Sequence, residues 1–305
     1  MRPLLNSTVR NATSPHTVRS ALISTAGHCK IACGFCFRAD RARGFLDIPT
    51  YTRALSRLKE VGVEGICLTG GEPAHHPELR QLARLAHQFG LSASLVTSAR
   101  DETDVERLAE IGHLLTNVTV SADTLGAMDL GGTQRSVLSG IATLEEHQSP
   151  ARTLHLTYWK VTDDESRFIY NLVKHAGVDV QLSPVTLDEA TRRRMGLSLD
   201  TYTKQQRHDT ECLGRYFHLT ARFRKHLQAL QVMHRHPSRR RRCCSSNVYV
   251  SARGEVRHCP YSKTGVQVYA SRADIRRFLT SPPQDWTTPD CAAICRADAP
   301  PVSGR

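Results

Sequence analysis

At 305 residues, the chain is long enough for one large domain and a smaller one. Its formal net charge is +12, but the arginines are dispersed and aromatic residues make up only 6%, which argues against a nucleic-acid-binding protein. We find no apolar run long enough for a signal peptide or a membrane span. The ten cysteines therefore favour metal ligation in a reducing cytoplasm over a disulfide scaffold.

Short apolar runs alternate with amphipathic stretches through the first two thirds of the chain. The predicted strands are Ala21–Thr25, Gly65–Thr69, Ala93–Thr97, Asn117–Ser121, Leu154–Trp159 and Val178–Leu182. Helices are predicted between them, and Gly62, Gly90, Gly112 and Gly177 stand where a left-handed cap would end a helix. Such regular alternation predicts parallel strands with right-handed crossovers, and six units are too few for the usual eight-stranded closure. We therefore predict an α/β protein with a partial (β/α)6 TIM-like barrel in residues 1–198 and a small domain in residues 199–305.

Three cysteines lie in one short loop after the first predicted strand. Cys29, Cys33 and Cys36 have the spacing C-x3-C-x2-C. Iron-sulfur cubanes are usually held by four thiolates, so three leave one iron open to chelate a small molecule. A zinc knuckle completed by His28, or reduced thiols without a metal, are the alternatives.

Two further candidate sets of functional residues follow the second and fourth predicted strands. Both lie at the carboxyl ends of strands, where the active sites of such barrels are found. The first is Gly70-Gly71-Glu72-Pro73, whose glycines allow close approach of the backbone and whose carboxylate can hold an ammonium group. The second comprises Ser121 and Asp123.

The cysteine triad, with Phe35 just before its last member, and the Gly-Gly-Glu-Pro run one unit later resemble the radical S-adenosylmethionine (SAM) superfamily. This resemblance implies a [4Fe–4S] cluster on the three cysteines and SAM chelating the open iron. One electron then cleaves SAM, and the resulting 5′-deoxyadenosyl radical abstracts hydrogen from a substrate. The SAM-binding residues that the resemblance implies are Phe35, Gly70, Gly71, Glu72, Ser121 and Asp123. The family's Thr-Asn-Gly after the third strand is Thr97-Ser98-Ala99 here, so we expect no ligand role there.

A second group of cysteines lies near the carboxyl end of the sequence. Cys244 and Cys259 form the pattern C-x9-G-x4-C, with Cys243 as an alternative first member, and Cys291 and Cys295 follow. Four thiols can close an iron-sulfur cluster or hold structural zinc, and their spacing does not separate the two metals. Next to a radical SAM barrel, this stretch resembles the twitch or SPASM region, which implies one auxiliary [4Fe–4S] cluster.

The resemblance leads us to expect a radical SAM enzyme that oxidises a small molecule, such as a sugar or nucleoside, in a specialised biosynthetic pathway. We expect no leader-binding domain, because only about twenty residues precede the first strand. A redox-neutral epimerase or carbon–carbon bond-forming enzyme is the first alternative, and a peptide maturase the second. An alternative outside the enzymes is a non-catalytic zinc protein.

A flavodoxin or ferredoxin is the expected electron donor. We expect it to dock at Arg239–Arg242, a run that would otherwise be a solvated turn. No catalytic acid or base is identified.

Overall fold

The computed structural model describes residues 18–29, 33–36, 44–132, 135–146, 149–185, 187, 189–217, 247–260, 262 and 264–281. Within these residues one sheet has the strand order β6-β5-β4-β3-β2-β1-β7-β8-β9. The strands are β1 (Ser20–Ala26), β2 (Gly65–Gly70), β3 (Ser92–Thr97), β4 (Asn117–Asp123), β5 (Arg152–Tyr158), β6 (Asp179–Pro184), β7 (Asn247–Val250), β8 (Glu255–Arg257) and β9 (Val266–Gln267). The helices are α1 (Ile48–Glu60), α2 (Leu79–Gln88), α3 (Glu102–Ile111), α4 (Leu125–Asp129), α5 (Val137–Glu146), α6 (Asp163–Ala176), α7 (Glu189–Arg194), α8 (Leu199–Gly214) and α10 (Arg272–Thr280). Two short 3-10 turns, η1 (Pro73–His75) and η2 (Gly112–Leu114), complete the set.

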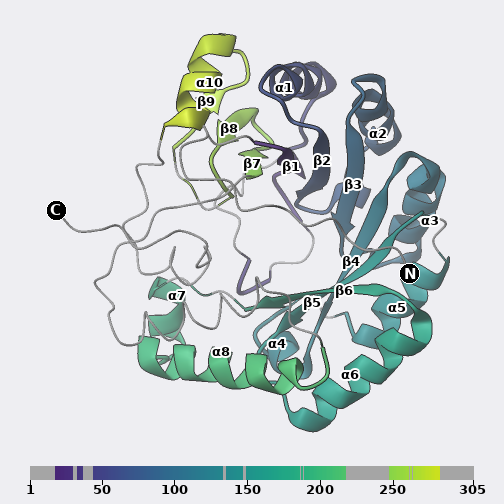
Figure 1. The fold of residues 1–305 in the computed structure, drawn as a ribbon, viewed down its shortest axis with the longest axis vertical. Helices are drawn as coiled ribbons and strands as arrows, with labels where there is room; N and C mark the ends of the chain where they lie inside the picture. The colour runs from purple at the N-terminus through teal and green to yellow at the C-terminus, as the bar shows by residue number, and fades with distance from the viewer. Residues whose placement is uncertain are drawn as a thin grey trace, which may run out of the picture.

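The first six strands form the predicted partial barrel. Strands β1 to β6 are all parallel and pair in chain order, each with the next. Right-handed crossovers in one direction place all the connecting helices on one face of the sheet. Figure 1 shows that face as a ring of helices around a curved sheet. The predicted α/β class and barrel are confirmed, with strand bounds that shift by only a few residues.

One predicted helix cap differs. Gly177 ends α6 in the left-handed region, with φ of 62°, as expected. Gly112, by contrast, has φ of −52° and begins η2, because the chain leaves α3 through a further tight turn.

The two faces of the sheet have different chemistry because successive residues of a strand point in opposite directions. Leu68, Leu95, Val120 and Leu156 are fully buried in the core beneath the helices. The alternate residues face the concave side and are largely polar. Pairing across β4, β5 and β6 brings Ser121, His155 and Gln181 into one row, and His155 Nε2 lies 2.8 Å from the hydroxyl of Ser183. The barrel interior is therefore lined by groups that can form hydrogen bonds.

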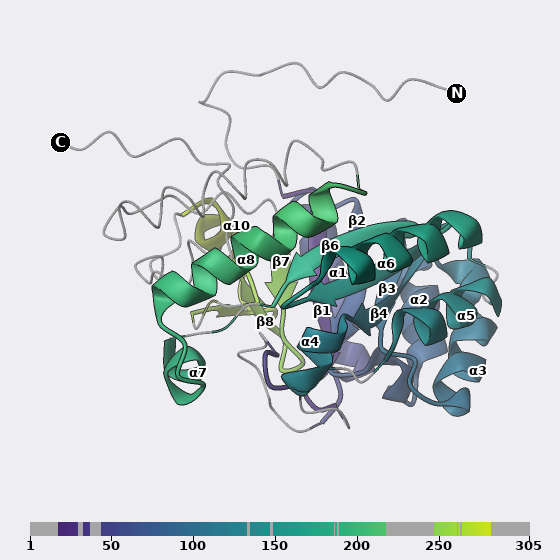
Figure 2. The same ribbon diagram turned by 90° about the horizontal axis from the view of Figure 1, so that it is seen from below.

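The described part of residues 199–305 packs directly on the barrel. Helix α8 lies beside α6 (Figures 1 and 2). The carboxylate of Asp209 in α8 accepts hydrogen bonds from the amides of Lys160 (2.8 Å) and Val161 (3.0 Å) after β5. Strand β7 pairs in parallel with β1, and the chain then turns back into β8 to form an antiparallel hairpin. The division into domains at residue 198 stays a prediction.

We find no helix among the described residues that could cross a membrane. The expected cytoplasmic location stays a prediction.

The half-buried imidazole of His155 should make stability depend on pH. Burial lowers the pKa of His155 to about 4, whereas an unfolded histidine titrates near pH ~6.5. Between these two pKa values, His155 is protonated in the unfolded state and neutral in the folded state. The stability linked to His155 is complete above the unfolded pKa and is lost as the pH falls toward the folded one. Between pH ~7 and ~5 we expect the unmodified protein to lose about 1–2 kcal/mol more stability than His155→Gln, measured by urea unfolding.

The matched control for this experiment is His113→Gln, which changes an exposed histidine in η2. It should lose as much stability as the unmodified protein over the same pH interval. Equal losses in His155→Gln would contradict the assignment of this pH dependence to His155.

Candidate functional site

The cysteine loop begins just beyond the carboxyl end of β1. Within the loop the amide of Cys36 donates to the carbonyl of Cys33 at 3.1 Å, forming a tight turn. The amide of Gly34 donates to the carbonyl of Gly131 at 3.0 Å, which ties the loop to the segment after α4. A Cβ atom at position 34 would lie 2.5 Å from the carbonyl oxygen of Leu130, so this close approach requires glycine. The loop is therefore held against the carboxyl end of the barrel.

The three thiols share one electrostatic environment with a carboxylate. The pKa of Cys33 is raised to about 12, first by burial and then by the neighbouring Cys36, Asp123 and Cys29. Three sulfur donors that would repel one another as thiolates fit a positively charged iron core, which removes that repulsion. By its chemistry this set of three sulfur donors fits a [4Fe–4S] cluster with one iron left open. Among the described residues, however, no three His, Cys, Asp or Glu side chains are gathered closely enough to hold a metal ion as they stand.

The glycines of the Gly-Gly-Glu-Pro loop bring the loops after β1 and β2 together. Gly70 has φ of 112°, and a Cβ there would lie 2.3 Å from the hydroxyl oxygen of Ser24. A Cβ on Gly71 would lie 1.7 Å from the carbonyl oxygen of His28, next to the first cysteine. The amide of Gly71 donates to the carbonyl of Ala26 at 2.7 Å. In this structure Gly70 is needed where the end of β2 lies against Ser24 of β1, and Gly71 is needed where the following loop passes the carbonyl of His28.

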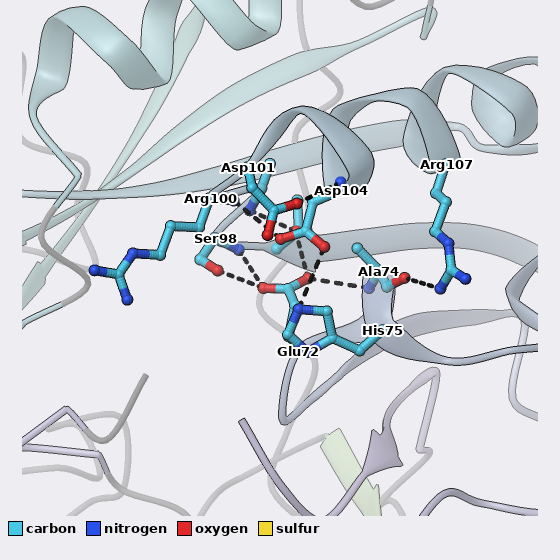
Figure 3. A network of polar contacts seen from close by, with 10 residues as sticks. Glu72, Ala74, His75, Ser98, Arg100, Asp101, Asp104 and Arg107 are labelled. Carbon is cyan, nitrogen blue, oxygen red and sulfur yellow. Dashed lines mark hydrogen bonds and ion pairs between the residues drawn. The ribbon is translucent and has the colours of Figure 1, made fainter. Parts of the chain in front are cut away.

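The carboxylate of Glu72 is buried, with 2% of the residue exposed, and it accepts four hydrogen bonds. The donors are the amide of Ala74 (3.0 Å), the hydroxyl of Thr97 (2.5 Å), and the amide (2.8 Å) and hydroxyl (2.5 Å) of Ser98. Figure 3 shows these contacts between the loop after β2 and the loop after β3. The predicted contact of Glu72 with an ammonium group stays a prediction.

Sequence reasoning missed the hydrogen bonds of Thr97 and Ser98 to Glu72, because it considered these residues only as possible ligand contacts. The available signal was their position, because two hydroxyl residues end a parallel strand next to the one that carries Glu72. It also missed Asp104 and Arg135, both almost fully buried. Asp104 lies in the first turn of α3 and Arg135 just before α5, so neither stands at a strand end.

Asp123 and Ser121 occupy different depths of the barrel. Asp123 is buried at the end of β4, where its amide donates to the carbonyl of Arg135 at 3.0 Å. Its charge contributes to the raised pKa of Cys33, so it lies beside the cysteine loop. Ser121 lies two residues deeper, in the row with His155 on the concave face.

Phe35 connects the cysteine loop to an apolar cluster at the ends of β5 and β6. Phe35 and Leu130 pack against a buried cluster that includes Trp159, Val185 and Tyr202. The ring of Trp159 stacks on that of Tyr202 in α8, with 5.5 Å between their centroids. The loop is thus anchored on its β6 side by apolar contact.

Most of the predicted auxiliary site lies outside the described residues. This applies to the cysteines at positions 243, 244, 291 and 295, and to the arginine run at positions 239–242. Cys259 is described: it follows β8, and its carbonyl accepts a hydrogen bond from the amide of Ser262 at 3.1 Å.

The sequence is similar to one known superfamily and to several characterised proteins. Residues 23–173, from β1 into α6, match the radical SAM superfamily. A PqqA peptide cyclase from Ruegeria pomeroyi is 38% identical over 82 residues, which is 26% of this chain and 22% of that protein. An S-adenosylmethionine-dependent nucleotide dehydratase from a Thermoplasmatales archaeon is 31% identical over 117 residues, which is 38% of this chain and 42% of that protein. The matched region thus spans less than half of either relative.

The fold resemblance extends further along the chain. Streptococcus suis SuiB bound to the precursor peptide SuiA superposes with a TM-score of 0.56 at 15% identity. The superposition covers 87% of this chain and 65% of that one. The sequence match over the barrel and the fold match beyond it agree, and the chain belongs to the radical SAM superfamily.

Proposed function

We propose that this radical SAM enzyme modifies a peptide. The observation that carries the proposal is the recurrence of PqqA peptide cyclases among the relatives, from Ruegeria, Gluconobacter, Bradyrhizobium and others. SuiB, a structure of similar fold, is bound to a precursor peptide, which shows that such a fold can accommodate one.

The expectation of a small-molecule substrate is wrong. The relatives and fold neighbours that overturn it are the PqqA peptide cyclases and SuiB with its precursor peptide. That expectation depended on the four cysteines of the predicted auxiliary site and on the short stretch ahead of the first strand. The length of that stretch does not determine the class of substrate, because a peptide can be bound by other surfaces of a protein.

Membership of the family implies a [4Fe–4S] cluster and SAM as cofactors. We assign the cluster to Cys29, Cys33 and Cys36. When both cofactors are bound, they supply the 5′-deoxyadenosyl radical that takes a hydrogen atom from the substrate.

The protein's own residues would position these cofactors and exclude water. We propose that SAM lies over the loops that carry Gly70, Gly71 and Glu72, with Ser121 and Asp123 on the β4 side. Phe35 would keep water from the cysteine loop, since it is part of an apolar cluster with Trp159. The amide of Gly34 donates to the carbonyl of Gly131, so the cysteine loop is joined to the segment that follows β4 and α4.

We further propose that Cys244, Cys259, Cys291 and Cys295 hold one auxiliary [4Fe–4S] cluster. Four thiolates leave no iron open, so such a cluster would supply electron transfer rather than substrate binding. This favours net oxidation of the peptide over a redox-neutral change.

Iron content tests the cluster assignments. Anaerobically reconstituted protein should contain two clusters, and replacing Cys29, Cys33 and Cys36 together by alanine should leave about half of the iron. Iron and sulfide analysis measures this. As a control, Cys67→Ala should retain all the iron, because Cys67 lies within β2 and burial raises the pKa of its thiol. Zinc together with a single cluster's worth of iron would overturn the auxiliary assignment.

Substrate class is tested with synthetic peptides encoded by short reading frames beside the gene. With SAM and dithionite under anaerobic conditions, one peptide should lose the mass of two hydrogens while 5′-deoxyadenosine accumulates, both measured by mass spectrometry. A redox-neutral reaction would instead keep the mass in water and gain one deuterium in heavy water. Turnover of GTP with no change in any peptide would contradict the peptide proposal.

A further inference from the structure

We infer that Glu72 is a positioning residue, whose carboxylate fixes the loops after β2 and β3 instead of binding the ammonium group of SAM. The inference rests on the proposed SAM site and assigns a different task to one of its residues. Its basis is the set of hydrogen bonds that this carboxylate makes within the protein (Figure 3).

The carboxylate is fully used by protein donors. A carboxylate offers about four acceptor positions, and Glu72 accepts four hydrogen bonds, two on each oxygen. Two of the donors are backbone amides, of Ala74 and Ser98, so the contacts determine the path of the chain as well as side-chain positions. An ammonium group would have to compete with short, buried hydrogen bonds.

The loop that Glu72 holds has an unfavourable backbone conformation. Ala99 has φ of +39°, in the left-handed region that residues with a Cβ adopt only against steric cost. Its amide donates to the hydroxyl oxygen of Thr97 at 2.8 Å, and that hydroxyl donates in turn to Glu72. The carboxylate therefore stabilises this turn through a chain of two hydrogen bonds. Local strain of this kind persists only where surrounding contacts oppose it.

A second carboxylate ties the same two loops together. Asp104 of α3 accepts the amide of Arg100 at 3.1 Å and lies 3.3 Å from His75 Nε2. Arg107, one turn later, donates to the carbonyl of Ala74 at 2.9 Å. The loop after β2 is thus held from α3 as well as from the end of β3.

The negative charges in this network face a buried cation. Arg135 is 6% exposed, and the charges of Glu72 and Asp104 oppose the lowering of its pKa by burial. Its carbonyl accepts the amide of Asp123, so the network reaches the end of β4. Glu72 accordingly lies within a framework that joins the ends of β2, β3 and β4, the three strands around the proposed SAM site.

The test compares Glu72→Gln with Ser98→Ala, which removes one donor to the same carboxylate. Reconstituted protein is examined for its urea unfolding midpoint and, by equilibrium dialysis, for its affinity for SAM and for a SAM analogue with hydrogen in place of the amino group. Glu78→Gln is the matched control, because it neutralises an exposed carboxylate in the same segment.

If Glu72 acts by positioning, Glu72→Gln lowers the unfolding midpoint and weakens SAM and the analogue by the same factor, on the order of tenfold. Ser98→Ala then lowers both affinities in the same way, and the double variant is weaker by less than the product of the two single effects. Glu78→Gln changes neither quantity.

Direct binding of the ammonium group predicts different results. Glu72→Gln would then weaken SAM while leaving affinity for the analogue and the unfolding midpoint unchanged, and Ser98→Ala would have no effect. This outcome overturns the inference. If Glu72→Gln does not fold, Ser98→Ala decides by itself. Equal weakening of SAM and the analogue by this variant supports positioning, whereas unchanged affinity for both overturns it. Unmodified protein that binds no SAM would overturn the proposed function itself, a failure distinct from unequal effects on the two ligands.

Discussion

The candidate site depends on one close backbone contact, between the amide of Gly71 and the carbonyl of Ala26. Parallel strands bring their carboxyl ends to the same edge of a sheet, but the loops that follow them diverge unless something joins them. Here the joint is backbone to backbone, and the nearby carbonyl of His28, which a Cβ on Gly71 would meet at 1.7 Å, leaves no room for a side chain. The cysteine loop and the Glu72 loop therefore begin from a shared point, and both are positioned relative to the barrel by it.

Buried carboxylates perform most of the remaining positioning. Glu72 and Asp104 hold the loops after β2 and β3, and Asp209 holds the loop after β5 against α8. Each accepts hydrogen bonds from backbone amides, and a hydrogen bond to a charged acceptor contributes about 1.5–3 kcal/mol. The loops at the carboxyl ends of the strands are thus ordered by charge-assisted hydrogen bonds. The apolar core contributes less there, because it lies between the sheet and the surrounding helices.

Features encoded by short stretches could be predicted from the sequence. The strands and helices follow from short apolar runs that alternate with amphipathic stretches, several of which end at a glycine. The cysteine loop and the Gly-Gly-Glu-Pro run are contiguous, and the predicted topology places them at one edge. The partners of Glu72 could not be found in this way, because Thr97 and Ser98 lie on another strand and depart from the family pattern that would have marked them. The prediction of a left-handed cap at Gly112 was wrong for a related reason. The backbone conformation there is set by the turn between α3 and β4 and not by the residue type. Substrate class was wrong because chain length ahead of a barrel carries no information about what its open edge binds.

The pairing of β7 with β1 has a consequence for how this protein is made. Ser20 and Asn247 are partners in the sheet although they lie more than two hundred positions apart in the chain. A ribosome completes the first strand long before it reaches its neighbour, so the outer edge of β1 offers unpaired amides and carbonyls for most of synthesis. Pairings between such distant segments form slowly, because a long loop must close before the contact stabilises anything. The outer edge of β1 in the nascent barrel is therefore open to strand-edge aggregation, and this exposure ends only when β7 pairs with it.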